Sequence, residues 1–170
     1  RERLGVDLRD SQILLLGAGG AARAAAFALC HENISSLTIA NRKLERAQAL
    51  VNDVQKDIPS TTAIPIEDTY LGRSARVADL IVNATSIGMS HGGNEGRSPL
   101  SADHIQPGTT VFDMVYTPTE TALLAETRKA GALGLGGLWM LVYQGASGFE
   151  LWTGKIAPVD IMYRAAETAL

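Results

Sequence analysis

The sequence has 170 residues, of which 46% are hydrophobic and 19% are charged, and its net charge is −3. This length and composition are typical of one globular domain and exclude a disordered or fibrous chain. The acidic balance argues against nonspecific binding to nucleic acid or to an anionic membrane, because both need a basic surface. With one cysteine, no signal peptide and no long apolar run, a cytoplasmic location is expected.

The first predicted unit is a strand, a glycine-rich turn and a helix. Residues 11–16 are a short, mostly apolar run, and the alanine-rich residues 20–32 favour a helix. Gly17 and Gly19 fill the first two positions of a dinucleotide fingerprint, and Ala22 fills the third. The turn would let a pyrophosphate approach the helix N-terminus. Such turns also occur for purely geometric reasons, so the motif alone leaves the function open.

The rest of the chain alternates between strands and helices. Further strands are predicted at 36–40, 61–66, 78–83, 110–114 and within 130–137, and further helices at 44–55, 67–77, 120–129, 138–152 and 158–170. Residues 1–10 are expected to be helical, and 85–107 to form a long functional or mobile loop with a short helical turn. This alternation predicts an α/β, Rossmann-like fold: a doubly wound, mainly parallel sheet with helices on both faces.

The end of the second predicted strand indicates which dinucleotide would bind. Domains that prefer NAD usually carry Asp or Glu there, whereas this chain has Asn41, Arg42 and Lys43, with Arg46 one helical turn further on. Cationic side chains suit a 2′-phosphate, and a bound phosphate would also relieve the conflict between these cations and the helix dipole. The residues therefore favour NADP over NAD, the other interpretation being a solvated helix start.

Other polar residues give weaker signals. The three histidines lie far apart in the sequence: His31, His91 and His104. They have no metal-ligand spacing among themselves or with the cysteine, so no metal site is predicted. Tyr116 follows a predicted strand and Gln144 lies in an apolar helix. The residues alone leave open whether these two side chains pack structurally or bind a ligand.

Taken together, five motifs resemble the shikimate dehydrogenase family and cover nearly the whole chain. They are residues 17–24 (GAGGAARA), 41–47 (NRKLERA), 82–89 (VNATSIGM), 112–116 (FDMVY) and 137–144 (GLWMLVYQ). The resemblance is to the C-terminal domain of that family, and it implies that residues 1–170 are one NADP-binding domain. The implied reaction is the reversible, NADPH-dependent reduction of 3-dehydroshikimate to shikimate, in aromatic amino-acid biosynthesis.

The resemblance also implies roles for individual residues. The residues implied for the pyrophosphate are Gly17, Gly19, Gly20 and Ala21. Those implied for the adenosine 2′-phosphate are Asn41, Arg42 and Arg46, with Lys43 where the family often has threonine. Those implied beside the cofactor are Asn83, Ala84 and Thr85, with Met114 and Gly137 flanking the nicotinamide. The side chains implied to reach the substrate are Tyr116 and Gln144.

One departure from the family limits what this chain is expected to do. The family's catalytic lysine and aspartate belong to a preceding N-terminal domain, to which nothing in this sequence corresponds. We therefore expect no catalytic residue here, cofactor binding with little turnover, and the N-terminal catalytic domain of the same polypeptide as a partner. Shikimate and quinate are not separated by these residues. The alternatives are an NAD-dependent quinate/shikimate dehydrogenase and a non-catalytic homologue that senses nucleotides.

Overall fold

The chain forms a parallel sheet of six strands with helices on both faces in the computed structural model, which describes residues 6–67, 69–90 and 93–170. The strands are β1 (Gln12–Leu16), β2 (Ser36–Asn41), β3 (Thr61–Pro65), β4 (Leu80–Asn83), β5 (Thr110–Asp113) and β6 (Leu133–Leu135). The helices are α1 (Gly20–Leu29), α2 (Leu44–Val54), α3 (Thr69–Val77), α4 (Ala122–Lys129), α5 (Leu138–Thr153) and α6 (Val159–Ala169), with a 3-10 turn, η1, at Ala102–His104.

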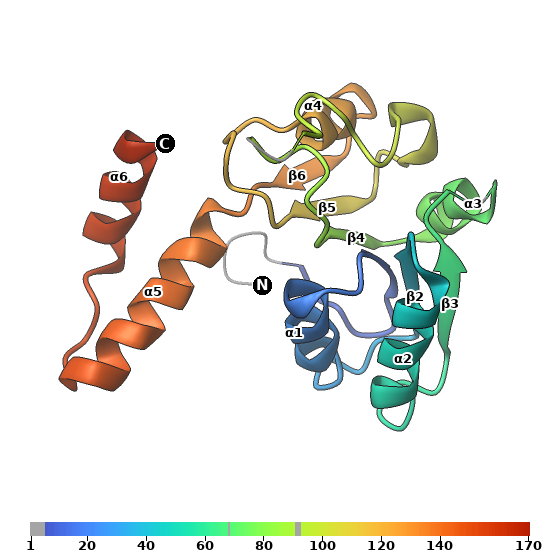
Figure 1. Cartoon of the computed structure of the whole chain (residues 1–170), viewed down its shortest axis with the longest axis horizontal. Coiled ribbons are helices and arrows are strands. Elements are labelled where there is room, and N and C mark those ends of the chain that lie inside the picture. The colour runs from blue at the N-terminus through green and yellow to red at the C-terminus, as the bar shows by residue number, and fades with distance from the viewer. Residues whose placement is uncertain (1–5, 68, 91–92) are drawn as a thin grey trace.

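The order of the strands is β3-β2-β1-β4-β5-β6, and every neighbouring pair is parallel (Figure 1). This is the order of a doubly wound Rossmann fold, so the predicted fold class is confirmed. Leu16 pairs with Ala40 of β2 and with Asn83 of β4. The ends of β1, β2 and β4 therefore meet at one edge of the sheet, where ligands bind in open α/β sheets.

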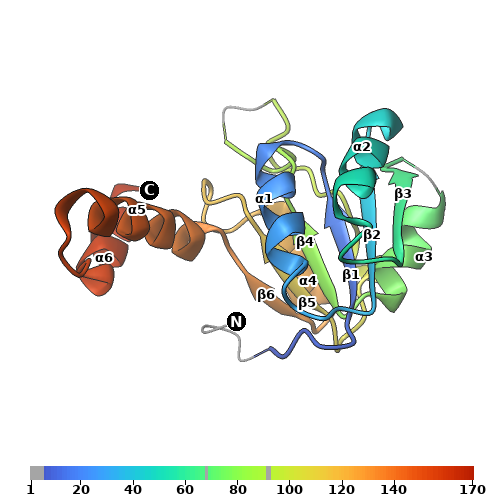
Figure 2. The ribbon, with the colours of Figure 1, turned by 90° about the horizontal axis from the view of Figure 1, so that it is seen from below.

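Alternate side chains of β1 feed two hydrophobic cores, as the period of a strand requires. Ile13 and Leu15 pack in a core with α1 and α2, while Leu14 and Leu16 pack in the other with α3 and with the start of α4. All four are almost completely buried. Figure 2 shows the helices on either side of the sheet. The central strand is thus fixed from both faces, which makes the turn that follows it a rigid platform.

Two sequence predictions are wrong at the level of elements. Helix α1 ends at Leu29 and does not reach residue 32. Of the helix predicted over residues 1–10, residues 6–10 form an extended segment and a turn, and residues 1–5 lie outside the described residues. Asn33 has a left-handed backbone (φ 51°), which asparagine tolerates and a continuing helix does not. Its carbonyl accepts a hydrogen bond of 3.0 Å from the N–H of Asp10. The segment before β1 and the turn after α1 therefore contact each other just beyond the end of the helix.

Helices α5 and α6 project away from the sheet and pack on each other (Figures 1 and 2). The rings of Trp139 in α5 and Tyr163 in α6 stack with their centroids 3.9 Å apart. Several apolar side chains of this hairpin are nonetheless exposed: Leu151 by 82%, Trp152 by 84%, Ile156 by 92% and Ile161 by 69%. Among the described residues, no helix is both long and apolar enough to cross a membrane.

Candidate dinucleotide-binding site

Two adjoining cavities lie at the carboxyl edge of the sheet. The first, the glycine-turn cavity, has a volume of about 320 Å³ and is lined by Gly17, Ala18, Gly19, Asn41, Arg42, Ile66, Glu67, Ala84, Thr85, Ser86, Ile87, Asn94 and Arg97. The second, the methionine cavity, has a volume of about 400 Å³ and is lined by Ala21, Ala84, Thr85, Met89, Ser90, Met114, Val115, Tyr116, Thr117 and Met140. Because Ala84 and Thr85 line both, one extended ligand can occupy the two cavities together.

The turn after β1 brings backbone close to this site. Gly17 has a φ of 108°, and a Cβ at this position would lie 2.8 Å from the carbonyl oxygen of Ala84. Only glycine satisfies both conditions, which explains the first position of the motif. Ala22 is completely buried against the sheet, so a small residue is also required there. The turn is therefore held tightly between β1, β4 and α1.

The start of α1 is open where the turn is tight. A Cβ at Gly19 or at Gly20 would have no atom of another part of the chain within 4 Å. Gly19 is the N-cap of α1, no side chain caps the helix, and its first turn contains no acidic residue. The free N–H groups and the positive end of the helix dipole thus face open space, which is the arrangement that binds phosphate in this fold.

The end of β2 supplies the polar wall of the glycine-turn cavity. Asn41 and Arg42 both line it, and Asn41 Nδ2 donates a 2.8 Å hydrogen bond to the carbonyl oxygen of Lys43. This bond fixes the backbone between β2 and α2. Lys43 is the N-cap of α2, and both Lys43 and Arg46 are exposed and lie outside the residues that line the cavity. Of the predicted phosphate ligands, the structure therefore brings Asn41 and Arg42 into the cavity.

The methionine cavity is walled by residues that follow β4 and β5 and by the start of α5. Ala21, Ala84, Thr85, Met114 and Tyr116, all predicted from the sequence, line it. Its described lining contains no Asp, Glu, His, Lys or Arg. The cavity can therefore surround an uncharged ring and exclude water, but it lacks the carboxylate, imidazole and amino groups that most often move protons.

Gly137 and Gln144 are placed differently from the other predicted residues. The N–H of Gly137 donates a 3.1 Å hydrogen bond to the carbonyl oxygen of Val115, and a Cβ here would lie only 2.3 Å from the carbonyl oxygen of Met114. Gly137 therefore supports the wall of the methionine cavity from behind. Gln144 is exposed on α5, one turn beyond Met140, and lies outside the cavity lining.

A buried polar network joins the ends of β4 and β5. Asn83 Nδ2 donates to Asp113 Oδ1 at 2.9 Å, and Asn83 Oδ1 accepts from the N–H and hydroxyl of Thr85 at 3.1 and 2.7 Å. Asp113 also accepts from the N–H of Val115 at 3.1 Å and from the hydroxyl of Thr121 at 2.6 Å. Both Asn83 and Asp113 are fully buried. The network fixes Thr85 and Val115, which line the methionine cavity.

Burial raises the pKa of the Asp113 carboxyl above its ordinary value, and the three hydrogen bonds that it accepts oppose this shift. Sequence reasoning placed Asn83 beside the cofactor and gave Asp113 no role. In the structure the Asn83 side chain acts behind the cavity wall, through Thr85. The signal that could have indicated Asp113 was its place at the end of β5, opposite Asn83 in the parallel ladder.

Sequence reasoning also missed several lining residues, among them Ile66, Glu67, Asn94, Arg97, Met89 and Met140. Five of these lie in the segments that follow β3 or β4, and this position alone was a usable signal. No group of three or more His, Cys, Asp or Glu that could hold a metal occurs among the described residues, and His91 lies outside them.

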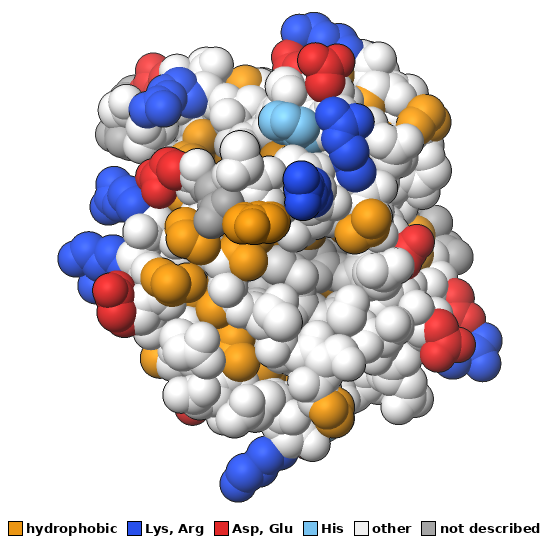
Figure 3. Space-filling model, turned by 90° about the vertical axis from the view of Figure 1, so that its right-hand side faces the viewer, with side chains coloured by type: hydrophobic (Ala, Val, Ile, Leu, Met, Phe, Trp, Pro, Cys, Tyr) orange, Lys and Arg blue, Asp and Glu red, His pale blue; other side chains and the backbone are white. Residues whose placement is uncertain are grey.

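On the face beside β3 and α3, charges of both signs lie mainly toward the margins (Figure 3).

These features fit a phosphorylated dinucleotide. Its phosphates would find N–H groups and a guanidinium in the glycine-turn cavity, and its redox-active ring, which is uncharged in the reduced form, would find an apolar enclosure in the methionine cavity. The open space at Gly19 and Gly20 is the backbone cradle that a bound phosphate requires.

Comparison with known proteins identifies relatives along most of the chain. A family model described as shikimate / quinate 5-dehydrogenase matches residues 1–91, and one described as the shikimate 5′-dehydrogenase C-terminal domain matches residues 137–167. The curated shikimate dehydrogenase (NADP(+)) of Methanopyrus kandleri is 44% identical over 167 residues. That alignment covers 97% of this chain and 57% of the relative, so the chain spans less than two thirds of the relative's length.

Solved structures resemble the whole described fold. Shikimate 5-dehydrogenase from Listeria monocytogenes, in complex with shikimate and NAD, superposes with a TM-score of 0.87 at 33% identity, covering 96% of this chain and 58% of that protein. Shikimate 5-dehydrogenase from Thermus thermophilus, in complex with NADP(H) and shikimate, superposes with a TM-score of 0.83 at 37% identity, covering 99% of this chain and 59% of that protein.

Proposed function

Because this chain belongs to the shikimate / quinate 5-dehydrogenase family, we propose that it is the NADP-binding domain of a shikimate dehydrogenase. The reaction of the whole protein would be the reversible reduction of 3-dehydroshikimate to shikimate by NADPH. The observation that carries the choice of cofactor is Arg42, a guanidinium lining the cavity at the end of β2, where NAD-binding domains usually place a carboxylate. The NADP-dependent relative from Methanopyrus kandleri supports the same choice.

We assign the phosphates to the glycine-turn cavity and the adjoining start of α1. The N–H groups at Gly19, Gly20 and Ala21 would hold the pyrophosphate, and Gly17 keeps the turn narrow enough for this approach. Asn41 and Arg42 would hold the adenosine 2′-phosphate. Lys43 and Arg46 lie outside the lining, so they would contribute by their charge, at longer range.

The nicotinamide would lie in the methionine cavity. Bound NADPH supplies the hydride, and the chain's own residues orient the ring and keep water away from it. Ala84, Thr85 and Met114 would contact the ring directly, while Asn83 and Gly137 would hold these contacts in place from behind. Tyr116 would reach the substrate, with Gln144 one helical turn beyond the cavity.

Proton transfer would need groups from outside this chain, since the described lining of the methionine cavity has no carboxylate, imidazole or amino group. We therefore propose that this chain binds cofactor but has little activity alone. Its partner would be an N-terminal catalytic domain of the same polypeptide, in the part of the relatives that this chain does not match. The exposed apolar side chains of α5 and α6, such as Trp152 and Ile156, offer a surface for it. A cytoplasmic location completes the proposal.

A second candidate is an NAD-dependent member of the same family, acting on shikimate or quinate. The Listeria monocytogenes structure contains NAD, so this fold accommodates either cofactor. Arg42 in the cavity wall favours NADP, because its guanidinium forms no ion pair with a described carboxylate and matches the oxygens of a 2′-phosphate. A nucleotide-sensing homologue without catalytic activity would share the same cavities.

The test is a pair of calorimetric titrations of this chain, one with NADP and one with NAD, at the same moderate salt concentration. The proposal expects clear preference for NADP. Preference for NAD would favour the second candidate, and binding of neither dinucleotide would refute both. Shikimate oxidation by the longer polypeptide, compared with this chain alone, then separates an enzyme from a nucleotide sensor.

A further inference from the structure

We propose that Arg97 is a second guanidinium that binds the phosphates of the dinucleotide, together with Arg42 in the glycine-turn cavity. This inference rests on the proposed function. Arg97 lies in the long segment after β4, far in sequence from both the glycine turn and the end of β2. The structure nevertheless makes it part of the same cavity lining as Gly17, Gly19 and Arg42.

The charges of this cavity are unbalanced in a way that suits an anion. Arg42 and Arg97 line it together with one acidic residue, Glu67. Neither arginine forms an ion pair with a carboxylate of the described residues. The polar contact of the Arg97 side chain is with an uncharged group, since its Nη1 donates to Asn94 Oδ1 at 3.3 Å. Two guanidinium groups that line one cavity without carboxylate partners offer their N–H donors to a bound phosphate.

The backbone around Arg97 is held against the start of the loop. The N–H groups of Gly88 and Arg97 both donate to the carbonyl oxygen of Asn94, at 3.1 and 3.2 Å. Gly88 has a φ of 90°, and a Cβ there would lie 3.3 Å from the carbonyl oxygen of Arg97. These contacts therefore hold the backbone of Arg97 against the part of the loop that contains Gly88.

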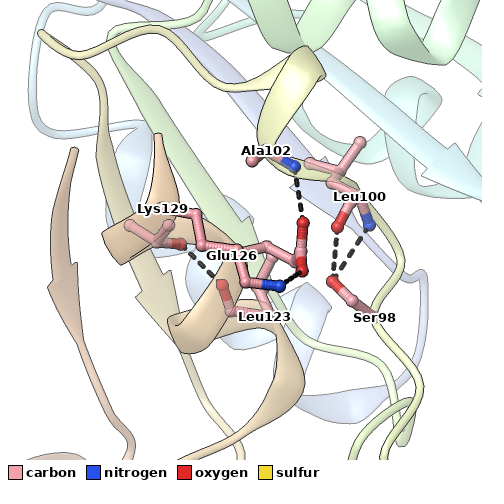
Figure 4. Close-up of polar contacts among 7 residues, drawn as sticks. Ser98, Leu100, Ala102, Leu123, Glu126 and Lys129 are labelled. Carbon is pink, nitrogen blue, oxygen red and sulfur yellow. Dashed lines mark hydrogen bonds and ion pairs between the residues drawn. The ribbon is translucent and has the colours of Figure 1, made fainter. Parts of the chain in front are cut away.

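The chain after Arg97 is anchored to α4 (Figure 4). Ser98 Oγ donates to the carbonyl oxygen of Leu100 at 2.5 Å, and the Leu100 side chain is buried in the core beneath α3 and α4. The N–H of Ala102 then donates to Glu126 Oε2 at 2.8 Å, while Glu126 Oε1 accepts from Lys129 at 2.6 Å. Because contacts before and after Arg97 fix its backbone, binding a phosphate would order little more than one side chain.

A guanidinium at this place has the chemistry for either phosphate group of the ligand. It presents a planar fork of N–H donors that matches the oxygens of a phosphate, and it stays charged at all working pH values. The cavity extends from the glycine turn to the end of β2, so the 2′-phosphate and the pyrophosphate are both candidates. The two are distinguished by comparing NADP with NAD, which lacks the 2′-phosphate.

The experiment measures the affinities of four variants of this chain for NADP and NAD: Arg97→Ala, Arg97→Lys, Arg42→Ala and, as the matched control, Arg73→Ala. Arg73 is a cation of α3 that sits over the ring of Tyr70 and lies outside both cavities. Thermal unfolding of each variant checks that the fold is kept. Arg97→Ala should lower the affinity for NADP roughly tenfold. Arg97→Lys should lower it less, because it keeps the charge and loses the fork.

Each outcome decides the inference. A greater loss for NADP than for NAD with Arg97→Ala supports a contact with the 2′-phosphate, and equal losses support a contact with the pyrophosphate. Unchanged affinity for both, with Arg42→Ala still weakening NADP, overturns the role of Arg97 and leaves the proposed function intact. Failure of the unaltered chain to bind either dinucleotide overturns both proposals.

Discussion

The two cavities at the carboxyl edge of the sheet are built from opposite kinds of residue. The glycine-turn cavity offers open N–H groups and guanidinium groups, while the methionine cavity offers three methionines and no Asp, Glu, His, Lys or Arg in its described lining. The first therefore supplies its ligand with direct partners within this chain. The second supplies walls and exclusion of water. Phosphate binding and placement of the reacting ring are thus separated between neighbouring cavities. A substitution in one cavity should leave the function of the other largely intact.

The largest effect should be the loss of stability caused by Gly137→Ala, because Gly137 supports the wall of the methionine cavity. Its Cβ would lie 2.3 Å from the carbonyl oxygen of Met114, and relieving this contact would require the backbone of one of the two residues to shift. We expect a loss of about 3 kcal/mol in the free energy of unfolding. Gly136→Ala is the matched control, because its Cβ would meet Leu124 and Thr119 only at 3.4 and 3.5 Å. Equal stability of the two variants in denaturant titrations would contradict this account.

Arg42→Ala should weaken NADP binding in the glycine-turn cavity without affecting the fold. Loss of a hydrogen-bonded guanidinium should weaken NADP binding by about 1.5–3 kcal/mol, roughly ten- to a hundredfold. The affinity for NAD should barely change, because NAD has no 2′-phosphate. Calorimetric titration with both dinucleotides measures the difference. Equal losses of affinity for the two cofactors would contradict the assignment of the 2′-phosphate to Arg42.

Gly19→Ala sharpens the comparison within the glycine turn itself. Since a Cβ at Gly19 meets nothing within 4 Å, stability should stay within about 0.5 kcal/mol of the parent. The added methyl group would occupy the approach to the pyrophosphate, so NADP and NAD should both bind about tenfold more weakly. Gly17→Ala is the contrasting variant and should lose stability, because of its φ of 108° and its contact with Ala84. A Gly19→Ala variant that binds normally would place the phosphates elsewhere.

The smallest effect concerns the network behind the methionine cavity. Because burial raises the pKa of Asp113, the folded protein holds this proton more tightly than the unfolded chain does. The stabilising contribution is complete below the ordinary aspartate value of about 3.9 and is lost as pH rises through the raised pKa. Asp113→Asn removes the titration. The free energy of unfolding of the parent, minus that of the variant, should fall with rising pH across this window and be constant above it. If the difference in the free energy of unfolding is independent of pH, the pKa of Asp113 is not raised by folding.

The fold and the glycine-turn cavity were largely predictable because their signals are local. The turn at Gly17 and the cations after β2 lie within short stretches of sequence, and the residue types in each stretch indicate its role without knowledge of the rest of the fold. The methionine cavity was less predictable, since its walls come from segments that only the parallel ladder brings together. Arg97 could not be placed at all, because the path of its loop depends on a hydrogen bond between Ala102 and Glu126, 24 residues apart.

The hydrogen bond and close contact of Gly137 also determine how the projecting hairpin behaves mechanically. The hairpin leaves the sheet at Gly137, where its backbone is wedged against Met114 and Val115. Because Gly137 is also the N-cap of α5, this junction ties the start of α5 directly to the wall of the methionine cavity. A partner domain bound to the exposed side chains of the hairpin would therefore be linked to the cavity wall through one backbone contact, which requires that residue 137 has no side chain.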